Sequence, residues 1–283
     1  MKKVTCVAGI VLYNPEMERL KENIHAVYHQ VDSLVLVDNA SHNNTQIEEL
    51  IKQYDRVFFI KNVKNEGIAK ALNQLMEYAN ENSIEWVLTL DQDSVVPENL
   101  MEEYSALLES TGLALVTPNI VDRNFSSDEN KNSGQEEVER CITSASLNNV
   151  EIWKKLGGFE ERLFIDYVDF EYCAKVRKNG YKIIRVNDVK LLHEVGNAEV
   201  KHIFRKTFIV YNHRPIRKYY FFRNIIYCIE KYPEFFNGKQ EKRNLKAMFL
   251  KSIIFEKYRG KKFFLMLKGI MDGKRMIKEE QEM

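Results

Sequence analysis

Cysteine is scarce in this sequence, and long apolar runs are missing. The cysteines, Cys6, Cys141, Cys173 and Cys228, are scattered along the 283 residues, and none forms a Cys-x-x-Cys pair. This spacing argues against a zinc site and against a disulfide scaffold, and it fits a reducing compartment. No stretch approaches the ~18 consecutive apolar residues of a membrane-spanning helix.

The start of the chain has the outline of a signal peptide but not its details. Lys2 and Lys3 precede an apolar run over residues 4–13, but the run is short and Asn14-Pro15 is not a small-residue cleavage site. We therefore assign residues 4–12 to a first strand. A cytoplasmic protein is expected, either soluble or held at the membrane surface.

Acidic residues are few in the last part of the chain. Residues 201–283 carry 21 Lys and Arg against 8 Asp and Glu, whereas residues 1–200 carry 21 basic and 33 acidic residues. Such asymmetry suggests two tasks, one of which meets an anionic surface.

Apolar strand patterns alternate with helical patterns along the first hundred residues. We expect strands over residues 4–12, 33–37, 57–60 and 86–90, and helices over residues 15–30, 45–54 and 68–79. This alternation predicts an α/β fold with a mostly parallel sheet flanked by helices. Further on, we expect a strand over 113–117, a solvated loop over 123–139, a short helix over 151–156, a helix from Tyr167 to Gly180, and strands over 182–186 and 189–192.

Two carboxylates close the predicted strand over residues 86–90. Asp91 and Asp93 follow residues 86–90 with one residue between them, so extended backbone would point both to one side. The carboxyl end of a parallel strand is where ligands bind, and hard oxygen donors suit Mg²⁺ or Mn²⁺ shared with a diphosphate. The alternative is an exposed acidic turn.

Polar residues also end the neighbouring strands. Tyr13-Asn14 follows the first strand and Asp38-Asn39 the second, and Asp38 could accept from a nucleobase N–H or a ribose hydroxyl. These residues are equally typical of turns. Likewise, Asn65-Glu66-Gly67 is either a nucleotide contact or only a loop with a helix cap.

A dense acidic cluster precedes the later helix. Asp166, Asp169 and Glu171 follow an apolar segment, with Asp166 placed to cap the helix and Asp169 in its first turn. His193 ends the last predicted strand, where a lone histidine is more often structural than a ligand.

In their order, these stretches resemble bacterial family 2 glycosyltransferases of the GT-A type, in particular rhamnosyltransferase-like members. The resemblance covers roughly residues 4–200. It is carried by Val11-Leu12-Tyr13-Asn14-Pro15, Val37-Asp38-Asn39-Ala40-Ser41, Asn65-Glu66-Gly67-Ile68-Ala69-Lys70-Ala71-Leu72-Asn73, Leu90-Asp91-Gln92-Asp93-Ser94, Gly157-Gly158-Phe159, Asp166-Tyr167-Val168-Asp169-Phe170-Glu171 and His193-Glu194-Val195-Gly196.

The resemblance implies a role for each matching position. The nucleotide would be bound by Tyr13, Asn14, Asp38, Asn65, Gly67 and Asp91. Asp93, with Asp91 and His193, would hold Mg²⁺ or Mn²⁺, and Asp169 would be the catalytic base. The family often has Glu before that base, whereas this chain has Val168, so Asp166 or Glu171 would supply the supporting acid.

The implied reaction is inverting, metal-dependent sugar transfer from a nucleoside diphosphate to a glycan or an undecaprenyl-diphosphate-linked acceptor in surface polysaccharide synthesis. Rhamnose on deoxythymidine diphosphate is the favoured donor; UDP-hexose and UDP-galactofuranose are alternatives. A non-catalytic nucleotide-sugar-binding scaffold is the alternative from another class. A nucleotidyltransferase is disfavoured, because no Gly-rich basic loop lies near the N-terminus.

We assign residues 1–204 to the catalytic domain and residues 205–283 to a basic, aromatic-rich helical extension. Basic helices with one apolar face are typical of membrane-surface segments, here the cytoplasmic face of the inner membrane. Packing on the catalytic domain or on a second copy in a homodimer explains the aromatic residues equally well. No nucleic-acid-binding module is recognised.

Overall fold

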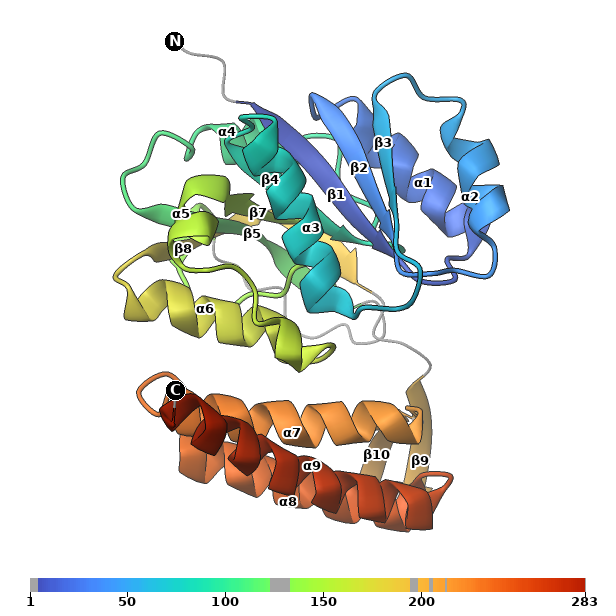
Figure 1. Ribbon diagram of the computed structural model, residues 1–283, viewed down its shortest axis with the longest axis vertical. Coiled ribbons are helices and arrows are strands. Elements are labelled where there is room, and N and C mark those ends of the chain that lie inside the picture. Colours follow the sequence, from blue (N-terminus) through green and yellow to red (C-terminus); the bar gives the residue numbers. More distant parts are fainter. Residues whose placement is uncertain (1–4, 123–132, 194–197, 204–205, 212, 283) are drawn as a thin grey trace. The chain divides into compact units, whose positions relative to one another are not determined.

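The computed structural model describes residues 5–122, 133–193, 198–203, 206–211 and 213–282, and these form two compact units. Unit 1 comprises Met1–Arg162 and Val168–Glu194, and unit 2 comprises Leu163–Tyr167 and Val195–Met283. The predicted α/β class, with a mostly parallel sheet and C-terminal helices, is confirmed (Figure 1).

The described part of unit 1 is built on an eight-stranded sheet of order β3-β2-β1-β4-β7-β5-β8-β6. Only β7 and β6 run antiparallel to their neighbours. The strands are β1 Cys6–Leu12, β2 Ser33–Asp38, β3 Val57–Lys61, β4 Trp86–Asp91, β5 Leu113–Asp122, β6 Gln135–Glu137, β7 Ser146–Asn149 and β8 Lys182–His193. The helices are α1 Met17–Tyr28, α2 Asn44–Ile51, α3 Ile68–Glu81, α4 Leu100–Ser105, α5 Val150–Lys155 and α6 Val168–Lys178.

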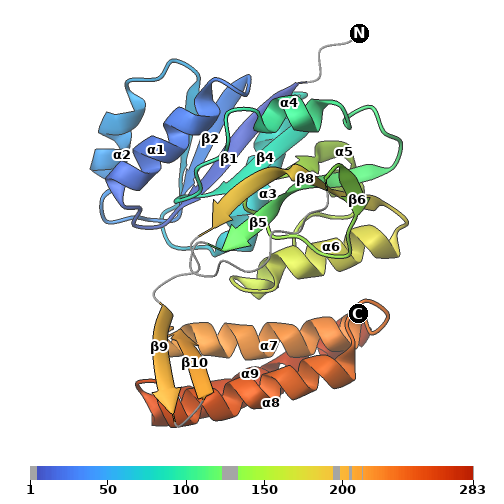
Figure 2. The same cartoon turned by 180° about the vertical axis from the view of Figure 1, so that it is seen from behind.

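The central strand β1 is buried on both faces, which explains its unbroken apolar sequence. Ile10 and Leu12 belong to the core formed with Leu20 and Ile24 of α1. On the other face Gly9 meets Leu75 of α3, where a Cβ on residue 9 would lie 2.6 Å from a Leu75 methyl carbon. The two helix layers are seen from opposite sides in Figures 1 and 2.

Three segments differ from the prediction. β7 is a strand of buried hydroxyl and amide residues where no strand was expected. Within the predicted loop over 123–139, residues 123–132 lie outside the described ranges, but Gln135–Glu137 pairs with β8. The two strands predicted over 182–192 are one strand, because Val186 pairs with Pro118 and Lys190 with Asn119, leaving three residues in a bulge.

In the C-terminal part of unit 2, two strands precede the helices that were predicted. β9 Ala198–Ile203 and β10 Lys206–Tyr211 form an antiparallel pair. Helices α7 Pro215–Lys231, α8 Gly238–Phe255 and α9 Arg259–Gln281 follow. No helix within the described ranges is long and apolar enough to cross a bilayer.

Glycines let α9 approach α7 closely. A Cβ on Gly269 would lie 2.5 Å from the Tyr219 carbonyl oxygen, and one on Gly273 would lie 2.4 Å from that of Arg223. Both distances are too short for a real side chain, so the two helices need glycine at these positions.

A buried ion cluster joins all three long helices of unit 2. Glu256, directly after α8, lies 2.9 Å from Nζ of Lys218 in α7 and 2.6 Å from Nζ of Lys262 in α9. The Ser252 hydroxyl donates to the same carboxylate. Although burial opposes ionisation, hydrogen bonds from Lys262 and Lys218 leave the pKa of Glu256 below its usual value. One buried carboxylate thus pairs with two buried lysines.

In unit 1, Asn73 fixes the turn that follows α5. Its side-chain oxygen accepts from the Phe159 N–H at 2.8 Å and from the Trp153 indole at 3.0 Å, and its amide donates to the Phe159 carbonyl at 3.0 Å. Lys175 of α6 donates to the Gly158 carbonyl at 2.7 Å. The turn therefore ties α3 to α6.

The two glycines of this turn form a matched test of that packing. Gly157 and Gly158 have φ of +74° and +75°, but only at Gly158 would a Cβ clash, at 2.8 Å from Asn73 Oδ1 and 3.0 Å from Trp153 Nε1. We expect Gly157→Ala to lower the free energy of unfolding by about 1–2 kcal/mol, the cost of left-handed backbone. Gly158→Ala should lose a further ~1–3 kcal/mol through overpacking. Urea unfolding measures both, and equal losses would contradict the packing role of Asn73.

Candidate active site

The carboxyl ends of β1, β2 and β4 meet at one edge of the sheet in unit 1. The parallel register pairs Leu12 with Asp38 and Val11 with Asp91, so the segments that follow these strands leave the sheet side by side. This edge is where parallel sheets bind ligands.

Hydrogen bonds connect the loops after the three strands. The Tyr13 N–H donates to the Gln92 side-chain oxygen at 2.9 Å, and the Asn14 N–H donates to the Ser41 hydroxyl at 2.8 Å. The His42 N–H donates to Asn14 Oδ1 at 2.8 Å. Asn14 has a φ of +50°, and Tyr13 is 45% exposed. The loops are thus fixed to one another while the Tyr13 ring stays accessible.

Asp38 is buried and organises the turn after β2. The Ser41 N–H donates to the Asp38 carboxylate, with its nitrogen 3.2 Å from both oxygens. Ala40, within the turn, has a φ of +62°. The turn chemistry predicted for this residue is therefore present. A carboxylate oxygen has more than one lone pair, so this bond leaves acceptor capacity for a ligand.

Asn65 and Gly67 belong to the loop before α3. The Gly67 N–H donates to Asn65 Oδ1 at 2.9 Å, and Asn39, at the end of β2, donates from its amide to the Gly67 carbonyl at 3.1 Å. Gly67 has a φ of +88°, and α3 begins at the next residue. A fourth segment is thereby held at the same edge.

Asp91 and Asp93 differ in their surroundings. Asp91 is half-buried at the end of β4, and its carbonyl accepts from the buried Asn23 amide at 2.7 Å. Asp93 is exposed. The next residue, Ser94, is buried and hydrogen-bonds through its hydroxyl to that of Ser144. The acidic turn is therefore anchored on both sides.

Asp169 lies in the first turn of α6 and lines a small cavity in unit 1. Tyr172, also on α6, has a buried hydroxyl with no hydrogen-bond partner among the described residues, and burial raises the pKa of that hydroxyl. The remaining wall includes hydroxyl, thiol and amide side chains. The lining residues are Leu115, Cys141, Ile142, Thr143, Ser146, Asn148, Phe159, Asp169, Tyr172 and Cys173.

Two consecutive residues connect this cavity to the acidic turn. Thr143 lines the cavity, and its carbonyl accepts from the Thr89 hydroxyl of β4 at 2.6 Å. Its neighbour Ser144 bonds to Ser94. Asp169 and the turn that carries Asp93 are thus linked through residues 143–144 of the same unit.

The other two acids of the cluster form ion pairs. Glu171 is fully buried, and its carboxylate lies 3.6 Å from Lys175 one turn later. Asp166 belongs to unit 2 and accepts from Arg217 of α7 at 3.0 Å. Val168, which directly precedes Asp169, is buried.

Asp166 also lines a basic hollow of about 140 Å³ in unit 2. His213, Arg217 and Lys218 surround it, together with Phe221 and Met248. Burial and the neighbouring Arg217 lower the pKa of His213 to about 4. At neutral pH the histidine is therefore uncharged.

His193 is the last residue of β8, where its backbone pairs with Asp122. Its side chain lies outside the described part of the structure, so the role predicted for it stays a prediction.

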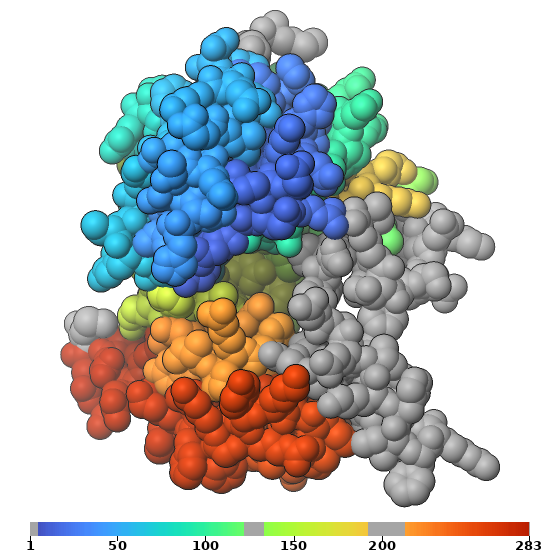
Figure 3. All heavy atoms as spheres, turned by 90° about the vertical axis from the view of Figure 1, so that its right-hand side faces the viewer, coloured from blue at the N-terminus to red at the C-terminus, as the bar shows by residue number. Residues whose placement is uncertain are grey.

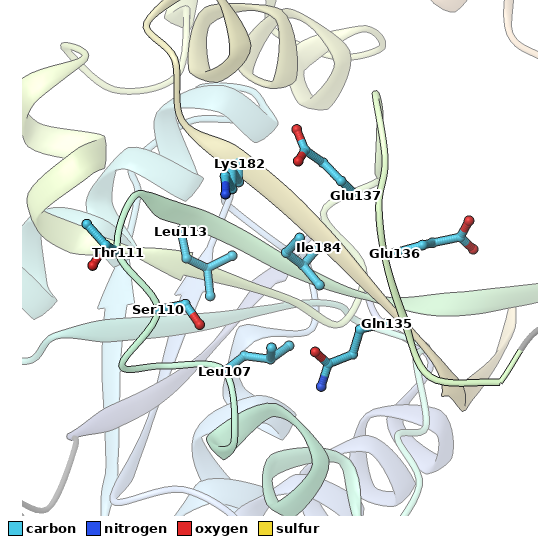
Figure 4. Close-up of a pocket in the computed structure, with 9 residues that line it drawn as sticks. All are labelled: Leu107, Ser110, Thr111, Leu113, Gln135, Glu136, Glu137, Lys182 and Ile184. Atoms are coloured by element: carbon cyan, nitrogen blue, oxygen red, sulfur yellow. The ribbon is translucent and has the colours of Figure 1, made fainter.

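A second hollow in unit 1 lies away from the sheet edge at which β1, β2 and β4 end. It has a volume of about 290 Å³ and lies where β5 and β8 begin, near Leu113 and Lys182 (Figure 4). Its other walls come from the segment after α4 and from β6. Ligands of parallel sheets bind at the opposite, carboxyl ends.

The acidic turn fits a divalent cation shared with a substrate. Among the described residues, no three His, Cys, Asp or Glu side chains gather closely enough to hold a metal on their own. Mg²⁺ is ordinarily bound by one or two carboxylates plus substrate phosphates, and Asp91 and Asp93 supply such oxygen donors.

Sequence reasoning missed several residues that shape the site. Gln92 and Asn23 hold the ends of β1 and β4, and Thr143 and Ser144 connect the cavity to the acidic turn. Gln92 stands between two predicted ligands, which was a usable signal. The others lie in a helix and in a segment without a recognisable pattern.

Solved structures share the fold. GalNAc-T7, solved with UDP, GalNAc and Mn²⁺, aligns with a TM-score of 0.58 at 17% identity, over 69% of this chain and 44% of that longer one. TarS residues 1–349 of S. aureus, in complex with UDP, aligns with a TM-score of 0.56 at 16% identity, over 79% of this chain and 64% of that one.

Two relatives found by sequence have a higher identity to this chain than these solved structures. The dTDP-rhamnosyl transferase RfbF of Shigella flexneri is 29% identical over 240 residues, which is 79% of either chain. The low-salt glycan biosynthesis hexosyltransferase Agl10 of Haloferax volcanii is 20% identical over 206 residues, 65% of this chain and 66% of the relative. The family model for glycosyl transferase family 2 matches residues 8–175, more than half of the sequence. The chain belongs to glycosyl transferase family 2.

Proposed function

We propose that this glycosyltransferase moves rhamnose from dTDP-rhamnose to a glycan acceptor, with inversion at the anomeric carbon. One observation carries the proposal: the ends of β1, β2 and β4 converge at one edge of the sheet. Residues 143–144 connect this edge to the cavity of Asp169. The likeness to the dTDP-rhamnosyl transferase RfbF supports the choice of donor.

The nucleotide would bind along the loops of this edge. Tyr13 and Asn14 would line the nucleoside pocket, with Asp38 accepting from the base or the ribose. Asn65 and Gly67 would approach the nucleotide from the start of α3. The hydrogen bonds among these loops support the assignment, because a preformed site loses less conformational entropy on binding.

Asp91 and Asp93, with His193, would hold Mg²⁺ or Mn²⁺ against the diphosphate. The bound ion would stabilise the charge that develops on the leaving nucleoside diphosphate. Asp93 is the exposed member of the pair, which suits a ligand that meets the diphosphate directly.

Asp169 would act as the base. The acceptor hydroxyl has a pKa far above neutrality, so a carboxylate must take its proton as the new bond to the anomeric carbon forms. The bond between that carbon and the diphosphate oxygen breaks, and its electron pair leaves with the diphosphate. Asp169 is favoured as the base because it lines the cavity linked to the acidic turn, and Asp166 and Glu171 would act as supporting acids.

The acceptor would be a glycan on a lipid carrier such as undecaprenyl diphosphate, met at the cytoplasmic face of the membrane. The basic residues of unit 2 support this part of the proposal, because such a carrier is anionic and embedded in a bilayer.

Two acid variants separate donor binding from chemistry. We expect Asp93→Ala to weaken Mn²⁺-dependent binding of the nucleoside diphosphate at least tenfold, about 1.4 kcal/mol. Asp169→Asn should bind the nucleotide normally but lose about 10²–10⁴-fold in kcat, together with the acidic limb of the pH–rate profile. Calorimetry and a transfer assay measure the two effects.

The matched control is Glu98→Ala, an exposed acid shortly after the same strand, and Asp166→Asn tests the alternative base. Full turnover in both Asp93→Ala and Asp169→Asn would contradict the proposal. Loss of the acidic limb in Asp166→Asn, but not in Asp169→Asn, would move the base to Asp166.

A thermal-shift panel of nucleotide sugars tests the donor. A ligand that binds only the folded chain at about 100 times its dissociation constant adds about 2.7 kcal/mol to apparent stability. We expect dTDP-rhamnose with Mn²⁺ to raise Tm by several degrees, and UDP-hexoses and UDP-galactofuranose to raise it less. A larger shift with a UDP-sugar would identify that donor instead, and binding without transfer would indicate a scaffold.

A further inference from the structure

Large apolar side chains are exposed around the turn between α8 and α9 in unit 2. Tyr258, in the turn, is 72% exposed, Phe264 is 71% exposed and Met271 is 60% exposed. Of the eleven large hydrophobic residues exposed in the described part of the chain, seven fall within the 22 positions from 250 to 271. They are Leu250, Ile254, Tyr258, Phe263, Phe264, Leu267 and Met271, which we call the α8–α9 surface.

Helical spacing gathers these residues into stripes. Leu250 and Ile254 are four apart on α8, and Phe264, Leu267 and Met271 follow at intervals of three and four on α9. The opposite side of α9 is already used, because Gly269 and Gly273 pack against α7. Side chains of these two helices, coloured red, form part of the face seen in Figure 3. The stripes are therefore not the faces that hold unit 2 together.

The charge around this surface has one sign. Between Arg243 and Met271 the sequence has eight Lys and Arg residues and a single acid, Glu256. That acid is 3% exposed and is paired with Lys218 and Lys262 inside the unit. The exposed ionic groups of this stretch are thus all cationic. They are Arg243, Lys246, Lys257, Arg259, Lys261 and Lys268.

Exposed apolar side chains ringed by cations distinguish between two possible partners of the α8–α9 surface, a second copy of the chain and a lipid bilayer. A second copy of the chain in a symmetric dimer would bring the same patch against itself, setting basic groups against basic groups. A bilayer with anionic headgroups instead attracts the cations and accepts the apolar side chains at the headgroup boundary.

We propose that the α8–α9 surface docks on an anionic lipid bilayer, with Tyr258, Phe264 and Met271 entering the headgroup layer. Docking would bring the enzyme to the lipid-linked acceptor of the proposed function, but the docking itself does not depend on the donor or on the sugar transferred.

Vesicle sedimentation of the full chain tests the proposal. We expect at least tenfold stronger binding to phosphatidylcholine vesicles containing phosphatidylglycerol than to phosphatidylcholine alone, and weaker binding at high salt. Phe264→Glu should reduce binding at least tenfold. Replacing Lys257, Arg259 or Lys261 by Gln should reduce it about fivefold per charge.

Val63→Glu is the matched control, because Val63 is fully exposed in unit 1 and the change adds the same charge. Equal binding of Phe264→Glu and Val63→Glu, or no preference for anionic vesicles, would overturn the proposal. So would a concentration-dependent dimer that only Phe264→Glu dissociates, measured by light scattering without lipid.

The docking test can fail independently of the proposed function. Phe264→Glu should retain nucleotide binding and transfer to a soluble acceptor, whereas Asp169→Asn should retain vesicle binding. If Phe264→Glu lost nucleotide binding and transfer to a soluble acceptor while circular dichroism confirmed its folding, the docking role would be contradicted.

Discussion

The candidate active site depends on the parallel register of β1, β2 and β4. Because Leu12 lies beside Asp38 and Val11 beside Asp91, three segments far apart in sequence end at the same edge. Burial of β1 on both faces fixes this register, since a slip by one residue would exchange the side chains that meet the two helix layers. The position of the acidic turn therefore follows from the hydrophobic core.

The sequence predicted the parts of the fold in which apolar pattern and structure agree. The strands β1, β2 and β4 are nearly continuous apolar runs and the helix α3 has strong helical periodicity, and the strand ends lie at one edge of the sheet, as the polar residues after them led us to expect. Gly180 ends α6 as expected, with a φ of +76°. The matching motifs led to family 2, which the comparisons confirm.

Other elements could not be predicted, because their stability comes from partners distant in sequence. β7 consists of Ser, Leu and Asn, and two of its polar side chains bond to the strands on either side, where Asn148 donates to the Thr89 hydroxyl of β4 and Ser146 to the Thr117 hydroxyl of β5. The bulge in β8 depends on its pairing with β5. The assignment of Asp166 and Asp169 to different units cannot be read from two acids three residues apart.

The charge asymmetry of the sequence has a structural counterpart. The acidic turn that would share a cation with the diphosphate lies in unit 1. In unit 2 the single acid near the α8–α9 turn, Glu256, is buried and paired with two lysines, and the exposed ionic groups around that turn are cationic. Each charge distribution suits one substrate of the proposed function, the cation-bound nucleotide sugar in unit 1 and an acceptor on an anionic membrane in unit 2.

A crystal structure of the chain with dTDP and Mn²⁺ tests the central claim most directly. The account predicts manganese density at Asp93, bridged to the diphosphate, with the base near Tyr13 and Asp38. Nucleotide bound in the hollow near Leu113 and Lys182, or manganese bound away from the acidic turn, would contradict it.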